Sequence, residues 1–188
     1  MPALVYYVAV SLDGYIAGPD GQFDAFLMEG DHMDGINQHY PDTIPTAFAG
    51  ALGIDQSQGP FDTVVMGANT YAMALPDYPS PYQHLDQYVF THRPYPEADG
   101  VTFTDRDPAT VVRELKAREG KDIWLCGGGN LAMQLADEID RLVLKRQPVF
   151  FGAGIPLFTP GSYAPQRFER VRSYDFDTGV SMVEYEVR

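Results

Sequence analysis

The sequence has little positive charge. Its 188 residues include 13 lysines and arginines against 26 aspartates and glutamates, and the formal net charge is −13. Because a surface this acidic repels nucleic acids and anionic membranes, we expect neither as a partner. A phosphorylated ligand would have to be held by local groups instead, such as the N–H groups at helix starts or a few arginine and histidine side chains.

Cysteine and long hydrophobic runs are also scarce. The single cysteine, Cys126, cannot form an internal disulfide bond, which favours a small buried thiol in a reducing, cytoplasmic compartment. No run approaches the roughly 20 apolar residues of a membrane span. The first ten residues lack the basic lead and cleavage site of a secretory signal. An apolar content of 45% is ordinary for a globular protein, so we expect one domain over residues 1–188.

Strand and helix patterns alternate along most of the chain. Strands are predicted at residues 3–10, 63–66, 87–91, 101–104, 122–126, 141–151 (broken near a proline), 167–174 and 180–187. Helices are predicted at residues 108–118, with Asp107 or Asp105 as the cap, Pro108 at the first position and Gly120 ending it, and at residues 130–136. Two weaker helices are predicted within residues 26–36 and 47–54. This order predicts an α/β fold with three αβα layers, a mostly parallel central sheet and an antiparallel C-terminal hairpin. That hairpin, which includes VEYEV, is a candidate surface for pairing or packing with a second copy.

Three consecutive glycines, Gly127–Gly129, separate a predicted strand from a predicted helix. In α/β sheets, ligands bind beyond the carboxyl ends of the strands, where helix starts present free N–H groups. With Ala132 the segment matches the dinucleotide pattern G-x-G-x-x-A, but it lies late in the chain and no acidic residue ends the next strand. A tight packing corner without a ligand is the alternative interpretation.

Two further strand ends carry groups suited to phosphate. VVMGANTY repeats the strand–glycine–helix arrangement, with Gly67 at the corner and the Thr70 hydroxyl in the first helical turn. YVFTHRP ends a third strand with Thr91, His92 and Arg93, a set of donors that suits an adenosine phosphate. An ordinary solvated turn is the alternative there.

The order of these motifs resembles the dihydrofolate reductase-like superfamily, and more closely its branch related to the reductase domain of riboflavin biosynthesis. The matching segments are VAVSLDGYIAG, VVMGANTY, YVFTHRP, IWLCGGGNLAMQL and DEIDRLVLKRQPVFFGAGIPLF. Only residues 24–59 match poorly.

The resemblance implies an NADPH-dependent reductase, with NADH as an alternative cofactor, a small-molecule substrate and a homodimer. It implies that nicotinamide contacts the backbone near Ala9 and the side chain of Ile16, under a mobile loop with the sequence SLDGYIAGPDGQF. The remaining cofactor contacts that it implies are Gly67, Thr70, Gly127, Gly128, Gly129, Asn130 and Leu131 at the pyrophosphate, and Thr91, His92 and Arg93 at the 2′-phosphate.

Two departures from the family pattern remove positive charge near the phosphates. Ala68 follows Gly67 where the family has arginine, and Asn130 stands where dihydrofolate reductases often have arginine. A charge-assisted hydrogen bond contributes roughly 1.5–3 kcal/mol, so these losses leave the preference for NADPH over NADH open.

Reduction of a C=N or C=O group needs a proton as well as a hydride. We predict Asp13 as the donor, with a pKa raised toward neutrality by partial burial beside nicotinamide. A turn in which Asp13 accepts backbone hydrogen bonds is the alternative. Asp24 is a second candidate donor or, more plainly, a helix N-cap, and water is a third source of the proton.

The substrate implied by the resemblance is a planar heterocycle, such as a pterin or pyrimidine, or a carbonyl compound. Tyr40, Phe48 and Tyr78 are candidates for its walls, with core packing as the alternative for each. No basic cluster is available for a ribosyl phosphate, which disfavours a pyrimidine reductase of the riboflavin pathway. A nucleotide-binding module or ligand sensor without turnover is a further alternative. The acidic cluster at Glu29–Asp34 is interpreted as a solvated segment, and no metal is expected.

Overall fold

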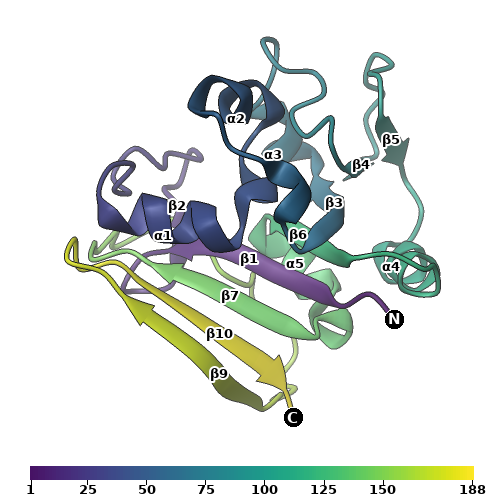
Figure 1. Cartoon of the computed structure of the whole chain (residues 1–188). Helices are drawn as coiled ribbons and strands as arrows, with labels where there is room; N and C mark the ends of the chain where they lie inside the picture. The colour runs from purple at the N-terminus through teal and green to yellow at the C-terminus, as the bar shows by residue number, and fades with distance from the viewer.

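A computed structural model describes residues 1–188, and its centre is an eight-stranded sheet (Figure 1). The strand order is β5-β4-β3-β6-β1-β7-β10-β9. The first six strands are mutually parallel, and β10 runs antiparallel to both of its neighbours, β7 and β9. The strands are β1 (Leu4–Val10), β3 (Phe61–Gly67), β4 (Asp86–Phe90), β5 (Val101–Thr104), β6 (Asp122–Gly127), β7 (Arg141–Arg146), β9 (Phe168–Asp175) and β10 (Ser181–Val187). The predicted parallel sheet with its antiparallel C-terminal hairpin is therefore confirmed.

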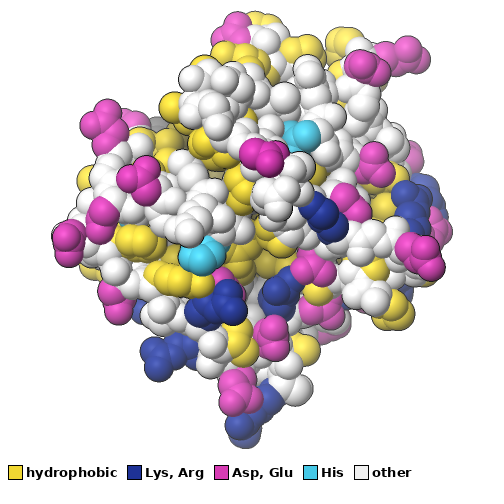
Figure 2. All heavy atoms as spheres, viewed as in Figure 1, with side chains coloured by type: hydrophobic (Ala, Val, Ile, Leu, Met, Phe, Trp, Pro, Cys, Tyr) yellow, Lys and Arg dark blue, Asp and Glu magenta, His cyan; other side chains and the backbone are white.

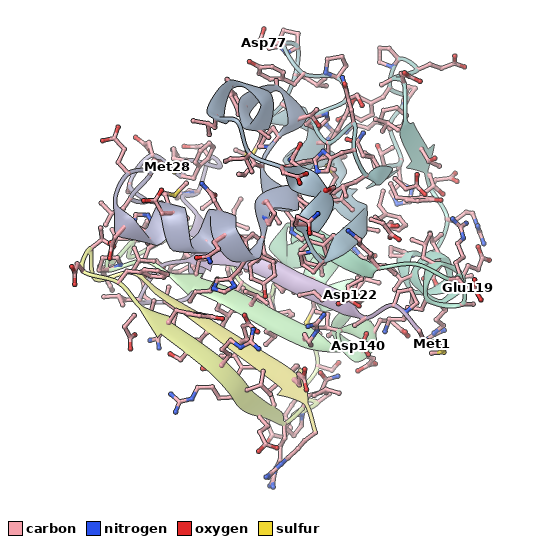
Figure 3. The ribbon with its side chains drawn as sticks, in the orientation of Figure 1. Met1, Met28, Asp77, Glu119, Asp122 and Asp140 are labelled. Carbon is pink, nitrogen blue, oxygen red and sulfur yellow. The ribbon has the colours of Figure 1, made fainter.

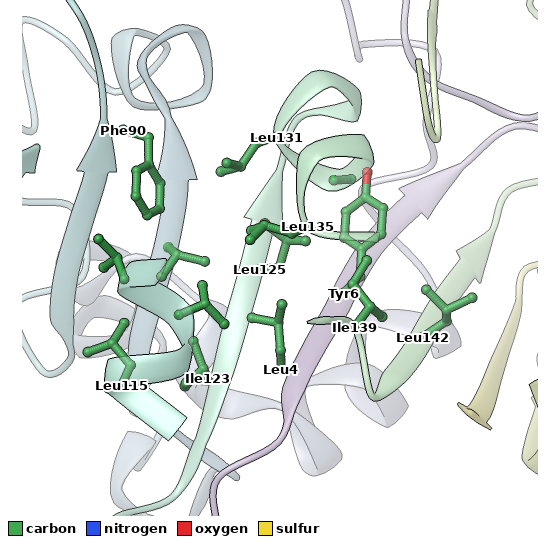
Figure 4. Packing of buried hydrophobic residues seen from close by; sticks show 14 residues of the cluster. Leu4, Tyr6, Phe90, Leu115, Ile123, Leu125, Leu131, Leu135, Ile139 and Leu142 are labelled. Atoms are coloured by element: carbon green, nitrogen blue, oxygen red, sulfur yellow. The ribbon is translucent and has the colours of Figure 1, made fainter. Parts of the chain in front are cut away.

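Helices cover both faces of this sheet, which confirms the three-layer prediction. They are α1 (Asp31–His39), α2 (Thr46–Leu52), α3 (Ala68–Ala72), α4 (Pro108–Lys116) and α5 (Gly129–Gln134), with short 3-10 turns η1 (Pro41–Thr43), η2 (Gln56–Gln58) and η3 (Ala136–Glu138). Leu4 and Tyr6 of β1 pack in a cluster with α4 and α5 (Figure 4), whereas Val5 and Tyr7 pack in a second cluster with α1 and α3. This alternation follows from the two-residue period of a strand and explains why β1 is apolar throughout.

Helix α4 shows how the local sequence sets an element. Asp107 accepts a hydrogen bond from Thr110 N at 2.8 Å and Pro108 takes the first helical position, as predicted. The helix ends at Lys116, two residues before the predicted end, and beyond it the Asp62 carboxylate accepts a hydrogen bond from Lys121 N at 2.7 Å.

Carboxylates fix the start of β1 at the edge of the sheet opposite the strand carboxyl ends (Figure 3). Asp122 accepts from Ala3 N at 2.8 Å, and Asp140 accepts from Leu4 N at 2.7 Å. Asp140 also pairs with Lys116 of α4 at 2.6 Å. These bonds hold β1 in place between its two neighbours.

The segment after β7 does not continue as a strand, so the prediction for residues 148–151 is wrong. Instead, a short strand β8 (Ile155–Pro156) pairs with β2 (Tyr15–Ala17), which lies within the predicted loop after β1. Leu12 N also donates to Val149 O at 2.8 Å. The base of the loop after β1 is thus fastened to the chain beyond β7.

The exposed edge of the hairpin is β9. Strand β10, which contains VEYEV, pairs with both β7 and β9, so β9 is the strand of the hairpin that is free to pair, and contact of the hairpin with a second copy stays a prediction. Residues 169–173 of β9 are exposed and include charged side chains, which protect an edge against uncontrolled pairing. A homodimer itself stays a prediction. No helix of the fold combines the length and apolar character needed to cross a bilayer.

Candidate nucleotide-binding cleft

A cleft of about 1530 Å³ opens at the carboxyl ends of the parallel strands. Its walls come from the chain after β1, β3, β4 and β6, and from α1 and α2. All twelve residues predicted to contact the cofactor line this one cleft: Ala9, Ile16, Gly67, Thr70, Thr91, His92, Arg93, Gly127, Gly128, Gly129, Asn130 and Leu131. The fold brings these positions together, and their contact with a cofactor stays a prediction.

The cleft begins where β1 and β6 separate. Their pairing stops at Tyr6 and Leu125, whereas β1 remains paired with β7 as far as Val10. One edge of β1 around Ala9 is therefore left without a neighbouring strand. A crevice of this kind at the carboxyl ends of parallel strands is where α/β folds bind ligands.

The two glycine corners are neighbours in space. Met66, one residue before Gly67, is in register with Gly127 across the parallel pair β3–β6. Gly67 precedes α3 and Gly128 precedes α5, and neither helix has a side-chain cap. The first N–H groups of both helices therefore lack capping partners and are available to one anion between them.

Two of the three consecutive glycines, Gly127 and Gly129, are needed for different reasons. Gly127 has φ of 133°, a conformation that side chains rarely adopt, and the Gly127–Gly128 peptide is cis. A side chain at Gly129 would collide with the carbonyl oxygen of Pro156 in β8. By contrast, space beside Gly67 and Gly128 is open, with only Thr70 and Ile16 in ordinary contact distance of the latter. The segment is thus both a tight packing corner and an accessible backbone surface.

The end of β4 is less free than predicted. The Thr91 hydroxyl accepts from Arg93 N at 2.9 Å and donates to Arg93 O at 3.0 Å, so it shapes the turn. The side chains of His92 and Arg93 are exposed and form no ion pair or hydrogen bond. Nearby Arg106 also lines the cleft, but Glu114 pairs with it at 2.5 Å. Arg93 is therefore the unpaired guanidinium at this end.

The raised pKa predicted for Asp13 is wrong, whereas its role as the proton donor stays a prediction. Its carboxylate accepts hydrogen bonds from Ser11 Oγ at 2.6 Å, Phe151 N at 3.1 Å and Gly152 N at 2.7 Å. Partial desolvation raises the pKa of Asp13, but these hydrogen bonds outweigh it and hold the pKa below its usual value. Asp13 is also outside the lining of the cleft, and the turn interpretation fits its geometry.

Asp24 is neither a helix cap nor a wall of the cleft. It lies exposed in a turn closed by Phe26 N and Phe23 O, and α1 begins seven residues later with Gly30 as its N-cap. The cap prediction is therefore wrong.

The acidic cluster before and within α1 has a structural role. Asp31 accepts from Asp177 N at 2.7 Å, and the buried His32 places its ring nitrogens 3.0 Å from Leu27 O and 3.1 Å from Thr178 Oγ1. These contacts fasten α1 to the turn between β9 and β10. No three histidine, cysteine, aspartate or glutamate side chains gather as metal ligands require.

The half of the cleft under α1 and α2 is apolar. Several large hydrophobic side chains line it while remaining well exposed: Phe23, Leu27, Met28, Phe48, Leu52 and Met73. Figure 2 shows hydrophobic side chains in the region of α1 and α2, with acidic groups around the periphery, and Figure 3 marks Met28 beside α1. Of the three predicted aromatic walls, only Phe48 lines the cleft, because Tyr40 is buried against Glu184 and Tyr78 lies behind Phe48.

Lys145 is a cleft residue that sequence reasoning missed. It belongs to β7, and its Nζ lies 4.0 Å above the ring centre of Tyr7. The signal was a lysine alternating with Val143 on the inward face of a strand. Nearby Cys126 also lines the cleft, and burial raises the pKa of its thiol to about 12, which leaves it an inert thiol at neutral pH.

Comparison with known proteins places the chain. Residues 2–182 match the family model of the RibD C-terminal domain. The chain belongs to the RibD C-terminal domain family. It is 36% identical over 161 residues to the uncharacterized protein YwjB of Bacillus subtilis (strain 168), covering 82% of this chain and 81% of that protein. It is 25% identical over 198 residues to the uncharacterized protein YyaP of the same organism, covering 97% and 93%.

Solved structures of RibD-like proteins share the fold. A candidate riboflavin biosynthesis protein from Shewanella sp. PV-4 superposes with a TM-score of 0.69 at 23% identity, covering 99% of both chains. A diaminohydroxyphosphoribosylaminopyrimidine deaminase/5-amino-6-(5-phosphoribosylamino)uracil reductase from Thermotoga maritima gives a TM-score of 0.66 at 16% identity. The match covers all of this chain but 57% of that protein. The predicted dihydrofolate reductase-like fold is confirmed, and membership of the family supports a reductase-like protein.

Proposed function

We propose that this protein is an NADPH-dependent reductase that transfers hydride to a small planar heterocycle or carbonyl compound. One observation carries the proposal: the corners at Gly67 and Gly127–Gly129 lie side by side and open into one cleft. Two uncapped helix starts facing the same space supply N–H donors from two directions, which suits a pyrophosphate on a protein of charge −13.

The residues present fit such a cofactor. Gly67 and Gly128 leave room for phosphate oxygens to approach the backbone, and the Thr70 hydroxyl lies beside the second corner. At the end of β4, Arg93 and His92 are exposed donors for a 2′-phosphate. When bound, the reduced cofactor supplies the hydride.

The chain supplies orientation and exclusion of water. The free edge of β1 at Ala9 and the side chain of Ile16, which reaches Gly128, form a slot for a flat ring. The loop after β1 is held at its base by Asp13, so Ile16 is presented from a fixed position. A ring held in this slot lies beside the apolar half of the cleft, where a substrate is shielded from water.

The test begins with calorimetric titration of NADPH and NADH, followed by loss of reduced-nicotinamide absorbance with pterin, pyrimidine and carbonyl panels. We expect binding of NADPH and oxidation with at least one panel. Tight binding without oxidation across all panels favours a binding module or sensor. Oxidation only with a ribosylphosphate-bearing pyrimidine favours the riboflavin-pathway reductase, and absence of cofactor binding contradicts the proposal.

A further inference from the structure

Lys145 is a half-buried cation without a counter-ion. The ion pairs of the structure are Arg106–Glu114, Arg113–Glu138, Lys116–Asp140, Arg141–Asp122 and Arg188–Glu169, and Lys145 takes part in none of them. Its Nζ forms no hydrogen bond and rests over the Tyr7 ring. Glu184 of β10, in register with Val143 and therefore on the same face as Lys145, is buried and accepts a hydrogen bond from the Tyr40 hydroxyl at 3.1 Å, but it forms no ion pair with Lys145.

An unpaired ammonium group in an apolar site is unfavourable unless something compensates it. The Tyr7 ring supplies part of that compensation, on the order of 0.5–2 kcal/mol for a cation over an aromatic face. The three donor protons of the ammonium group still lack acceptors. Because Lys145 lines the open cleft, these protons are accessible to a ligand that provides an acceptor.

Two other polar side chains in this part of the cleft, Gln147 and His32, are already engaged. Gln147 Oε1 accepts from Leu27 N at 3.0 Å, and both ring nitrogens of His32 have partners. The Cys126 thiol stays protonated. Lys145 is thus the cation left in this part of the cleft to recognise a charged feature of a substrate, and the Asn37 amide is a neutral donor that also lines it.

The position of Lys145 places it near the proposed hydride-transfer site. Lys145 is in register with Ala9 on the neighbouring strand β1, whose free edge is the proposed nicotinamide contact. Apolar residues that line the same cleft include Phe26, Met33 and Ile36. The donors suited to phosphate, Arg93 and the glycine corners, lie at the other strand ends.

We infer that the substrate is a largely apolar molecule with a single acidic oxygen group, such as a carboxylate, and no phosphate. One oxygen of that group accepts a hydrogen bond from Lys145 Nζ, while the apolar body packs under α1 and α2. This inference rests on the proposed reductase function, because it assigns the other half of the cleft to the cofactor. A phosphate dianion is held by several donors, and only one free cation is present here.

Binding of model ligands tests the inference without knowledge of the true substrate. Naphthoate, naphthalenemethanol and naphthyl phosphate share an apolar body and differ in the polar group. Each is titrated by calorimetry into the protein saturated with NADP⁺. The variants are Lys145→Met, which keeps the length of the side chain without charge, and Arg146→Met as a matched control. Arg146 is exposed, unpaired and outside the cleft lining.

Wild-type protein is expected to bind naphthoate more tightly than the alcohol or the phosphate. Lys145→Met should weaken the binding of naphthoate about 10- to 100-fold, as expected for a lost charge-assisted hydrogen bond. The affinity for the alcohol should be unchanged. Arg146→Met should leave all three unchanged. Equal naphthoate affinity in wild type and Lys145→Met, tighter binding of the phosphate, or no naphthoate binding at millimolar concentration overturns the inference.

The same experiment distinguishes failure of the proposed reductase function from failure of the inference about Lys145. If NADP⁺ itself does not bind, the reductase proposal is contradicted. The same naphthoate titrations of the free protein then still decide whether Lys145 recognises an acidic group. Thermal unfolding of Lys145→Met checks that the variant is folded.

Discussion

Asp13 fastens the loop after β1 to the chain beyond β7 through hydrogen bonds from Phe151 N and Gly152 N, and it accepts a third from Ser11 Oγ within the loop. We expect Asp13→Asn to lower the midpoint of thermal unfolding, since an amide cannot accept all three bonds. Because the folded pKa is depressed, this stabilisation is present at neutral pH and is lost as the pH falls below the ordinary value of 3.8. Exposed Asp24→Asn is the matched control and should leave the midpoint unchanged.

The rate of cofactor oxidation separates this role from acid catalysis. Loss of a proton donor typically slows the chemical step by about 10²–10⁴-fold. If Asp13→Asn shows that loss with unaltered thermal stability, Asp13 is the acid after all and the turn assignment is wrong.

Asp42 predicts a pH dependence of stability. Its side chain is fully buried, Oδ1 has no partner and Oδ2 accepts from Phe61 N at 2.6 Å. Burial raises the pKa of Asp42 from 3.8 to about 6. Between these values the unfolded chain ionises while the folded protein stays protonated. The free energy of unfolding therefore decreases as the pH rises through this window, by on the order of 1–3 kcal/mol.

Asp42→Asn should remove that decrease, because an amide does not titrate. Urea denaturation at closely spaced pH values from about 4 to about 7 measures the effect against wild type. Parallel pH profiles of the two proteins are the result that counts against this account.

At the scale of elements, α5 packs closely against β8 because Gly129 has no side chain. A methyl group there meets the backbone oxygen of Pro156, so Gly129→Ala must push α5 and β8 apart. We expect weaker NADPH binding and a loss of roughly 1–3 kcal/mol of stability from overpacking. Calorimetric titration and urea denaturation measure the two effects.

Gly50→Ala is the control for this substitution. Gly50 lies within α2, exposed, with nothing close to an added methyl group, so alanine should be neutral or stabilising by up to about 1 kcal/mol. If both alanine variants behave alike, packing of α5 against β8 is not what orders the corner.

The elements that are predicted best from the sequence are those whose capping residues and apolar spacing lie within the element itself. Helix α4 follows from the cap at Asp107 and from the apolar spacing of Val111, Val112 and Leu115, all buried. Strands β2 and β8 were missed because pieces of two or three residues have no measurable period. They form only through pairing across more than 130 residues of chain.

In the candidate site too, features set by neighbouring residues are predictable from the sequence, and features set by distant residues are not. Strand ends followed by glycine and a helix start identify the corners, since adjacent parallel strands end at one edge of a sheet. The role of Asp13 depends on N–H groups 138 and 139 residues away, which no local pattern reveals. To predict the face of β7 on which Lys145 lies, one must know that the strand begins at Arg141 and that the side chain of Val143 points inward.

At the scale of the whole molecule, the surface repels the ligand that the cleft is proposed to hold. Selection for a 2′-phosphate must then come from a few local groups, of which Arg93 is the unpaired guanidinium. We expect Arg93→Ala to weaken the binding of NADPH about 10- to 100-fold and to change the affinity for NADH little. Arg106→Ala is the control, since Glu114 already neutralises Arg106. Equal losses for both cofactors would contradict recognition of the 2′-phosphate.

The central claim is that backbone N–H groups of two adjacent corners hold one diphosphate. Titration of ¹⁵N-labelled protein with NADPH, followed by amide NMR, tests it most directly. The account predicts that the largest amide shifts fall at Gly67–Thr70 and Gly127–Leu131 together and saturate at one equivalent of cofactor. Shifts confined to one corner, shifts only elsewhere, or no saturable change would contradict it.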